Sequence, residues 1–232
     1  MTLKVWNIEA GVCLRSINAH NNLISGLVEI LGQENATLLA TCSWDKTLKV
    51  WDMNDGSLQK TLKGHKDSVR CVTQMSWKRN SDTLLSGASD KFIKVWDISK
   101  GECIKNISGH SDSVYSLEFI KWEKNETTFI SASYDKTLKI WDIDTGSCIK
   151  TLTGHTHYVN RCFQLNFGYD ETLVVSCSFD KSIRVWNLQT GKIMKQLKGH
   201  SDYVMGLTQL VTNKDYITLI SGSGDNTVKI WE

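Results

Sequence analysis

Apolar and polar residues alternate along this chain in short runs, and Gly, Asp, Asn or Ser stands at the ends of each run. Within residues 110–152 the pattern predicts four strands, at 113–120, 127–133, 136–143 and 148–152. The runs are rich in β-branched and aromatic residues, and no helical period of useful length appears. The link at 144–147 contains Gly146, which predicts a tight hairpin with a positive φ at that glycine. We therefore expect antiparallel strands and essentially no helix.

The same unit recurs every 45 residues without a residue gained or lost, as four independent columns show. These columns are tryptophans at Trp6, Trp51, Trp96, Trp141, Trp186 and Trp231, histidines at His20, His65, His110, His155 and His200, aspartates at Asp45, Asp90, Asp135, Asp180 and Asp225, and glycines at Gly11, Gly56, Gly101, Gly146 and Gly191. Repeats of this size bury their apolar faces against their neighbours. We predict a single domain over residues 1–232, with units ending near Trp51, Trp96, Trp141, Trp186 and Trp231 and an N-terminal partial unit at 1–18.

The joint signature resembles the WD40 repeat. Gly109-His110 is followed by the run 131–142, SASYDKTLKIWD, and the likeness covers nearly the whole chain. The dipeptide Trp-Asp at 51–52, 96–97 and 141–142 is relaxed to Trp-Asn or Trp-Glu elsewhere, and Gly-His is relaxed once, to Ala19-His20. The resemblance implies an all-β propeller of four-stranded antiparallel blades, five of them present, with an incomplete or open ring as one form.

The two ends of the chain repeat the same strand, because 2–6 and 227–231 occupy equal positions in the unit. Full third strands therefore occur once more often than first and second strands. Three explanations stay open: a fragment of a longer propeller, an open arc, and closure by pairing of 13–18 onto the last blade. An open arc exposes strand edges, which favours self-association.

A hydroxyl stands four residues before each repeated aspartate, so each unit holds a Ser or Thr, a His, an Asp and a Trp. One interpretation is a hydrolase triad. The other, which the WD40 resemblance implies, is a buried hydrogen-bond network from the indole N–H through the hydroxyl and imidazole to the carboxylate. We favour the network, because catalysis needs one exposed nucleophile with an oxyanion hole rather than five equal copies. Its residues are His20, Thr41, Asp45 and Trp51; His65, Ser86, Asp90 and Trp96; His110, Ser131, Asp135 and Trp141; His155, Ser176, Asp180 and Trp186; and His200, Ser221, Asp225 and Trp231.

Function is sought where the copies differ. Three columns vary: the residue before each repeated aspartate, and the third and fifth residues after each histidine. In WD40 propellers these columns open onto one face, so the resemblance implies a protein-binding rim; the alternative is that some rings pack sideways between blades. The candidate rim residues are Trp44, Arg70, Tyr115, Tyr134, Tyr158, Asn160, Phe179, Tyr203 and Met205. Aromatic, Arg and Met side chains are enriched in interface hot spots.

Composition narrows the remaining classes. A formal charge of +2 with no basic block gives no indication of nucleic-acid binding. The N-terminal MTLKVWNIEA has no signal-peptide pattern and no long apolar run follows, so we expect a cytoplasmic protein, with the nucleus left open, and no membrane contact. The seven cysteines form no C-x-x-C pair and indicate reduced structural thiols; Cys103 and Cys148 share a column with Leu58 and Ile193, which predicts small buried hydrophobes. No metal or cofactor motif is present in the sequence.

These observations favour a non-enzymatic scaffold that binds peptides or protein subunits on one propeller face. The runner-up is a substrate-recognition module of a ubiquitin ligase or of another multiprotein complex. A Ser-His-Asp hydrolase is the remote third alternative.

Overall fold

The computed structural model describes residues 1–30, 37–75, 82–122, 127–165, 172–210 and 217–232. Every regular element in these ranges is a β-strand, and the chain divides into two compact units, Met1–Asn106 and Ile107–Glu232. Among the described residues there is no helix, and so none that has the length and apolarity to cross a lipid bilayer. The all-β prediction is confirmed.

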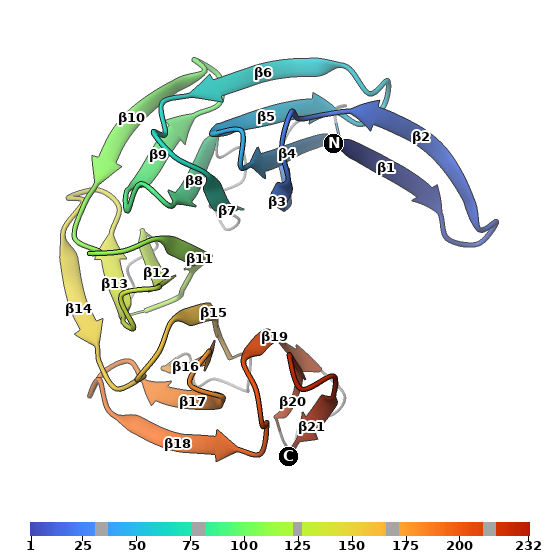
Figure 1. Cartoon of the computed structure of the whole chain (residues 1–232). Coiled ribbons are helices and arrows are strands. Elements are labelled where there is room, and N and C mark those ends of the chain that lie inside the picture. Colours follow the sequence, from blue (N-terminus) through green and yellow to red (C-terminus); the bar gives the residue numbers. More distant parts are fainter. Residues whose placement is uncertain (31–36, 76–81, 123–126, 166–171, 211–216) are drawn as a thin grey trace. The chain divides into compact units, whose positions relative to one another are not determined.

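The first unit contains one two-stranded sheet and two four-stranded sheets (Figure 1). The two-stranded sheet pairs β1 (Thr2–Asn7) with β2 (Val12–Asn18). The next sheet holds β3 (Ile24–Ile30), β4 (Leu38–Ser43), β5 (Thr47–Asp52) and β6 (Leu58–Lys63). The last holds β7 (Val69–Gln74), β8 (Thr83–Ala88), β9 (Ile93–Asp97) and β10 (Glu102–Ile107).

The second unit contains three sheets, each with its strands in sequence order. The first comprises β11 (Val114–Phe119), β12 (Thr128–Ser133), β13 (Leu138–Asp142) and β14 (Cys148–Leu152). The second comprises β15 (Val159–Gln164), β16 (Leu173–Ser178), β17 (Ser182–Asn187) and β18 (Ile193–Lys198). The third comprises β19 (Val204–Leu210), β20 (Thr218–Ser223) and β21 (Val228–Trp231), with no fourth strand among the described residues. The strands predicted for 110–152 are β11–β14, with ends shifted by at most two residues.

Three of the four-stranded sheets carry a bulge directly before the repeated tryptophan. The register between the third and fourth strands shifts between Val50 and Trp51, and the same shift occurs between Ile140 and Trp141 and between Val185 and Trp186. A bulge bends the strand and redirects the side chain that follows it. The hairpin beyond the bulge closes through a glycine with positive φ, for example Gly146 at 71°, as the sequence predicted.

In the four-stranded sheets burial is deepest in the second and third strands. All six residues of β12 are buried, whereas only Leu152 is buried in β14. In the second unit Ile130 and Ile140 of one sheet belong to the same apolar cluster as Val174 and Trp186 of the next. Neighbouring sheets therefore stack face to face, and the fourth strands form the outer layer.

The outer layer corrects one prediction about the cysteines. Cys148 is exposed and Cys103 only partly buried, because fourth strands keep one face in solvent. The buried thiols belong to other strands, at Cys42, Cys162 and Cys177. Burial raises the pKa of Cys42 and Cys177 to about 12. All seven cysteines are free thiols.

Besides the rim candidate Trp44, two tryptophans stand outside the repeated column. Trp77 lies outside the described residues. Trp122 is 8% exposed within the apolar cluster of the second unit, and Lys150 Nζ lies 5.2 Å from its ring centroid. Core packing, rather than a contact surface, accounts for Trp122.

The turn between second and third strands holds a strained backbone that the sequence did not reveal. Lys46, Lys91, Lys136 and Lys181 have φ between 68° and 73°, and Asn226 takes the same position with φ 63°. Residues other than Gly, Asn and Asp seldom adopt this conformation. The backbone is therefore strained at the four lysines, whereas the last repeat has an asparagine there, which adopts this conformation more readily.

Replacing Lys136 with glycine should raise the free energy of unfolding by about 0.5–1 kcal/mol, since the left-handed conformation costs an L-residue about 1–2 kcal/mol and glycine returns part of this as chain entropy. Urea unfolding measures the change. The matched control is Lys139→Gly inside β13, which should destabilise by about 1 kcal/mol. Destabilisation by both variants would contradict the strain.

Candidate functional site

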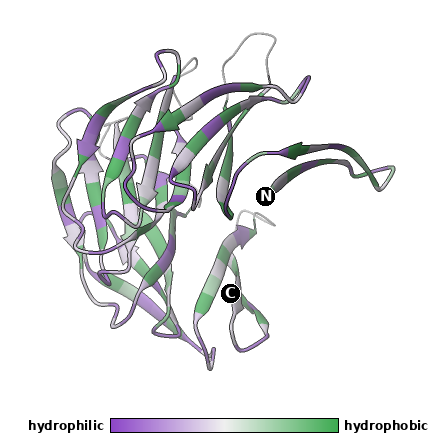
Figure 2. Cartoon of the chain, turned by 45° about the horizontal axis from the view of Figure 1, so that its top comes forward, coloured by the Kyte–Doolittle hydropathy of each residue, from purple (hydrophilic) through white to green (hydrophobic). Residues whose placement is uncertain are grey.

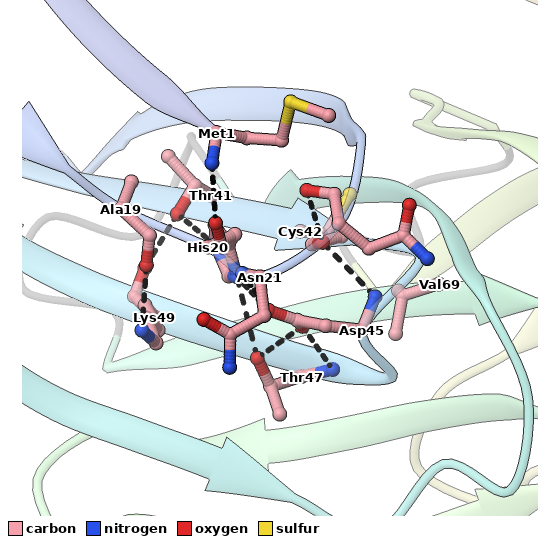
Figure 3. Close-up of polar contacts among 12 residues, drawn as sticks. Met1, Ala19, His20, Asn21, Thr41, Cys42, Asp45, Thr47, Lys49 and Val69 are labelled. Carbon is pink, nitrogen blue, oxygen red and sulfur yellow. Dashed lines mark hydrogen bonds and ion pairs between the residues drawn. The ribbon is translucent and has the colours of Figure 1, made fainter.

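The side chains of the repeated columns form five hydrogen-bond networks, each from an indole to a carboxylate. In the first network Trp51 Nε1 donates to Thr41 Oγ1 (2.9 Å). Figure 3 shows its other members, in which Thr41 Oγ1 lies 2.8 Å from His20 Nε2 and His20 Nδ1 lies 2.8 Å from Asp45 Oδ2. The other four repeat it with Ser in place of Thr. Their distances are 2.7–2.8 Å from the indole to Ser, 2.6–2.8 Å from Ser to the imidazole and 2.7–2.8 Å from the imidazole to Asp.

The carboxylate sets the direction of each network. Asp45 Oδ2 can only accept, so Nδ1 of His20 carries the proton and Nε2 accepts from the Thr41 hydroxyl. The same Oδ2 accepts the Asn21 backbone N–H (3.1 Å), and Oδ1 accepts the Thr47 hydroxyl (2.6 Å). One aspartate therefore joins the loop before the first strand to the turn before the third.

Burial and hydrogen bonding shift the pKa of both partners downward. Desolvation lowers the pKa of His20 and of His155 below the usual value, although Asp45 and Asp180 oppose this. Burial by itself would raise the pKa of Asp45, but hydrogen bonds from Thr47 and His20 outweigh it and lower the pKa to about 2. The same bonding lowers the pKa of Asp90, Asp135, Asp180 and Asp225. The networks of His20 and His155 are therefore most stable with a neutral imidazole and an ionised carboxylate.

The hydroxyls of the networks are closed to substrates. Thr41, Ser86, Ser131, Ser176 and Ser221 are all 0% exposed. Each hydroxyl oxygen also accepts the indole N–H of its own 45-residue repeat, so one of its lone pairs is occupied. Attack on a carbonyl needs an accessible hydroxyl oxygen beside an oxyanion hole. These hydroxyls are inaccessible, and none of the five networks differs from the others in a way that would single it out for catalysis.

In the first unit the structure brings together two candidate rim residues, Trp44 and Arg70. The Arg70 guanidinium carbon lies 4.1 Å from the Trp44 ring centroid, and its Nε donates to Ser89 Oγ (2.7 Å). The guanidinium thus bridges the sheets β3–β6 and β7–β10 within that unit. Trp44 remains 36% exposed, so part of the indole is open to a partner.

In the second unit three tyrosines form a continuous stack. The Tyr134 ring lies between Tyr115, at a centroid distance of 3.8 Å, and Tyr158, at 4.0 Å, with the planes nearly parallel. Tyr115 and Tyr134 belong to the sheet β11–β14 and Tyr158 precedes β15. The alternative that some rings pack sideways between sheets therefore holds for Tyr134, which packs onto the next sheet.

A second aromatic group follows along the same unit. Phe179 stacks on Tyr203 at 4.5 Å, and His157 lies within 5.9 Å of both rings. Tyr203 is 41% exposed. His157 was not among the predicted rim residues, although it stands where other units have Asn22, Asp67, Asp112 or Asp202. In each case the side chain accepts the next backbone N–H, and His157 Nδ1 does so from Tyr158 at 2.8 Å.

The remaining candidates, Asn160 and Met205, join two sheets. Asn160 Nδ2 donates to the Met205 backbone oxygen (2.6 Å), which links β15 to β19. The Met205 side chain is 49% exposed. Asn160 thus has a structural partner, whereas the Met205 side chain stays available at the surface.

Comparison with known families gives one result. The model of the family described as WD domain, G-beta repeat matches residues 11–52, 56–97, 101–142, 146–187 and 191–232. No curated protein sequence matches the chain. Among the described residues no group of His, Cys, Asp or Glu has the geometry to hold a metal ion.

Changing His110 to alanine should lower the free energy of unfolding by about 2–4 kcal/mol, because Ser131 and Asp135 would each lose a buried partner. Chemical denaturation measures the loss. The matched control is His157→Ala, which removes an imidazole outside the networks and should cost less than about 1 kcal/mol. Equal losses would show that the networks contribute nothing special.

Stability should fall as the pH drops below about 6.5, and fall again below about 4. His20 and His155 have lowered pKa values when folded, so the unfolded chain binds protons first and stability is lost from the unfolded pKa downward. Asp45 stabilises above its unfolded value and loses this contribution as the pH approaches about 2. Melting temperatures from pH 8 to pH 3 test this. A His20→Gln/His155→Gln variant should show a shallower slope between pH 6.5 and 5, and an unchanged slope would contradict the assignment.

Proposed function

We propose that this chain, which belongs to the WD40-repeat family, is a non-enzymatic scaffold that captures peptides or protein subunits through its aromatic rim. Repeats of this family generally mediate interactions between proteins. The observation that carries the proposal is the concentration of partly exposed aromatic side chains in the columns that differ between copies. The His, Asp, Ser or Thr and Trp side chains of the repeated columns hydrogen-bond to one another inside the networks, so they are not offered to a partner.

The packing of the rim suits a binding role. Tyr134 is held between two rings, and Phe179 is held against Tyr203. A rigid ring loses little conformational entropy on binding, which raises the affinity gained for a given contact. Trp44, Tyr203 and Met205 add exposed apolar surface, with 36%, 41% and 49% of each side chain in solvent. Stacking and binding are therefore compatible, because Tyr203 is stacked on Phe179 and still partly exposed.

The burial of the network hydroxyls supports a role without catalysis. The state of Arg70 weakens the ubiquitin-ligase alternative, since a recognition module for acidic or phosphorylated substrates needs a guanidinium that can turn toward an anion. Arg70 already contacts Trp44 and Ser89. No observation favours that alternative over a general scaffold, and a cytoplasmic location stays a prediction.

Changing Trp44 and Tyr134 together to alanine should reduce partner capture about tenfold or more, as expected when hot-spot rings are truncated. Affinity purification from cell extract with quantitative mass spectrometry measures the capture, and circular dichroism checks the fold. The matched controls are Tyr134→Phe, which keeps the stack, and Ile104→Ala on the outer layer, where the side chain is 54% exposed. Undiminished capture by a folded double variant would move the binding site elsewhere.

A further inference from the structure

A polar pocket with a volume of about 400 Å³ lies beside the first hydrogen-bond network, inside the unit Met1–Asn106. Its walls come from the loop before β3, the turn before β5 and the facing strands β5 and β6. All of its lining side chains are polar: Asn21, Asp45, Thr47, Lys49, Thr61 and Lys63. The pocket therefore differs from the apolar contacts that join neighbouring sheets, and its chemistry indicates a polar ligand.

The strand residues of the pocket share one face of the sheet. The register of β5 and β6 places Thr47 opposite Lys63 and Lys49 opposite Thr61. Residues two apart in a strand turn to the same side, and hydrophilic residues are interspersed with hydrophobic ones along the strands (Figure 2). The two lysines are thus diagonal neighbours, a relation that separates two residues by about 7–8 Å.

The carboxylate of the pocket already has a full set of donors. Asp45 Oδ2 accepts from His20 Nδ1 (2.8 Å) and from the Asn21 backbone N–H (3.1 Å). Asp45 Oδ1 accepts from the backbone N–H (3.1 Å) and the hydroxyl (2.6 Å) of Thr47. An ionised carboxylate has about four acceptor sites, and these bonds occupy them. Asp45 therefore offers no acceptor to a cation.

Hydrogen-bond donors, in contrast, remain available in the same pocket. Lys49 Nζ donates to the Ala19 backbone oxygen (2.5 Å), which uses one of the N–H groups of the ammonium (Figure 3). Among the described residues, the Lys63 ammonium, the Thr61 hydroxyl and the Asn21 side-chain amide have no hydrogen-bond partner. Two ammonium groups stand against one carboxylate, so the lining carries a net positive charge. These properties match a ligand with negative charge and accepting oxygens.

The corresponding residues of another sheet form a closed pair. In the sheet β11–β14, Lys139 Nζ donates across the strands to Thr151 Oγ1 (2.9 Å). These two residues occupy the repeat positions of Lys49 and Thr61. In the sheet β3–β6 the Lys49 ammonium turns to Ala19 instead, and the Thr61 hydroxyl has no such donor within the described ranges. The sheet β3–β6 thus opens a polar pair that its copy closes.

Lys63 supplies a second positive charge where two other sheets have a hydroxyl. Its counterparts are Ser108 after β10 and Thr153 after β14. Two ammonium groups on neighbouring strands repel each other. An anion bound between Lys49 and Lys63 relieves this repulsion, so the pocket favours a negatively charged ligand.

We propose that this pocket binds a phosphate group, either as the free inorganic ion or as a small phosphate monoester. Lys49 and Lys63 provide the charge, and the Thr61 hydroxyl and the Asn21 amide complete the set of donors. A phosphate group presents at least three strongly accepting oxygens, and lysine binds it as a point charge. None of the lining residues belongs to the aromatic rim, so the phosphate site does not depend on the proposed protein contact.

Titration of the full chain with inorganic phosphate and, separately, with glycerol 3-phosphate tests the site. Chloride keeps the ionic strength constant, and backbone amide chemical shifts report the binding. At least one ligand should bind saturably and shift the amides of Asn21, Thr47 and Thr61. Tighter binding of glycerol 3-phosphate identifies the monoester as the ligand, and tighter binding of phosphate identifies the free ion. No saturation by either ligand up to about 10 mM would overturn the proposal.

Lys63→Gln should weaken the binding of phosphate about tenfold or more, because it removes a charge-assisted hydrogen bond. Lys63 is exposed, so the variant should fold like the wild type. The matched control is Lys198→Gln, which changes the corresponding exposed lysine of the sheet β15–β18 and should leave the binding unchanged. Equal weakening by both variants would show a general attraction of phosphate to lysines, and the pocket would lose its role.

Thr61→Val separates the shape of the pocket from its charge. Valine keeps the branched side chain but removes the hydroxyl donor, so phosphate should bind about threefold or more weakly. Circular dichroism and urea unfolding check that the variant is folded. Wild-type affinity in this variant would mean that Thr61 does not contact the ligand, which would overturn the proposed arrangement.

Discussion

The structure depends on a single buried contact, the imidazole held between a hydroxyl and a carboxylate. In each unit this contact joins the loop before the first strand to the second strand, the third strand and the turn between them. His110, for example, ties Ser131 of β12 to Asp135, and the Ser131 hydroxyl in turn accepts from Trp141 of β13. Because these groups are buried, each would be costly if it lost its partner, so the four elements are fixed as one body.

The networks divide the columns of the repeat into those that hold the fold together and those that are free to differ between copies. The columns that form the networks cannot vary without leaving a buried group unpaired, whereas the columns at the turn can accept different rings. The rings are not independent of the scaffold, however. Tyr134 packs between Tyr115 and Tyr158, and Arg70 lies on Trp44, so the rim also joins neighbouring sheets within each unit. Rings fixed by such packing lose little conformational entropy on contact, which is the physical basis of the proposed binding role.

The predictions that succeeded rest on local patterns. The strands of 110–152, the positive φ at Gly146 and the membership of the WD40-repeat family follow from spacing and turn chemistry. The prediction that failed concerns which face a side chain turns to, since Cys148 is exposed because β14 is an outer strand. Which rings pack sideways was left open, and Tyr134 does so because the next sheet brings Tyr158 against it. His157 was missed because it belongs to the column of Asp112, which is not one of the three columns in which the rim was sought.

The sequence by itself determined the repeat, its strands and the residues available for the networks, because strand periodicity and turn preference are properties of short segments. It did not determine which rings stack, or that Ile8 stays exposed while Leu188 is buried. These outcomes depend on the neighbour that each sheet meets. Identical residues in successive copies can therefore be core in one place and surface in another, and only the tertiary structure decides between the two.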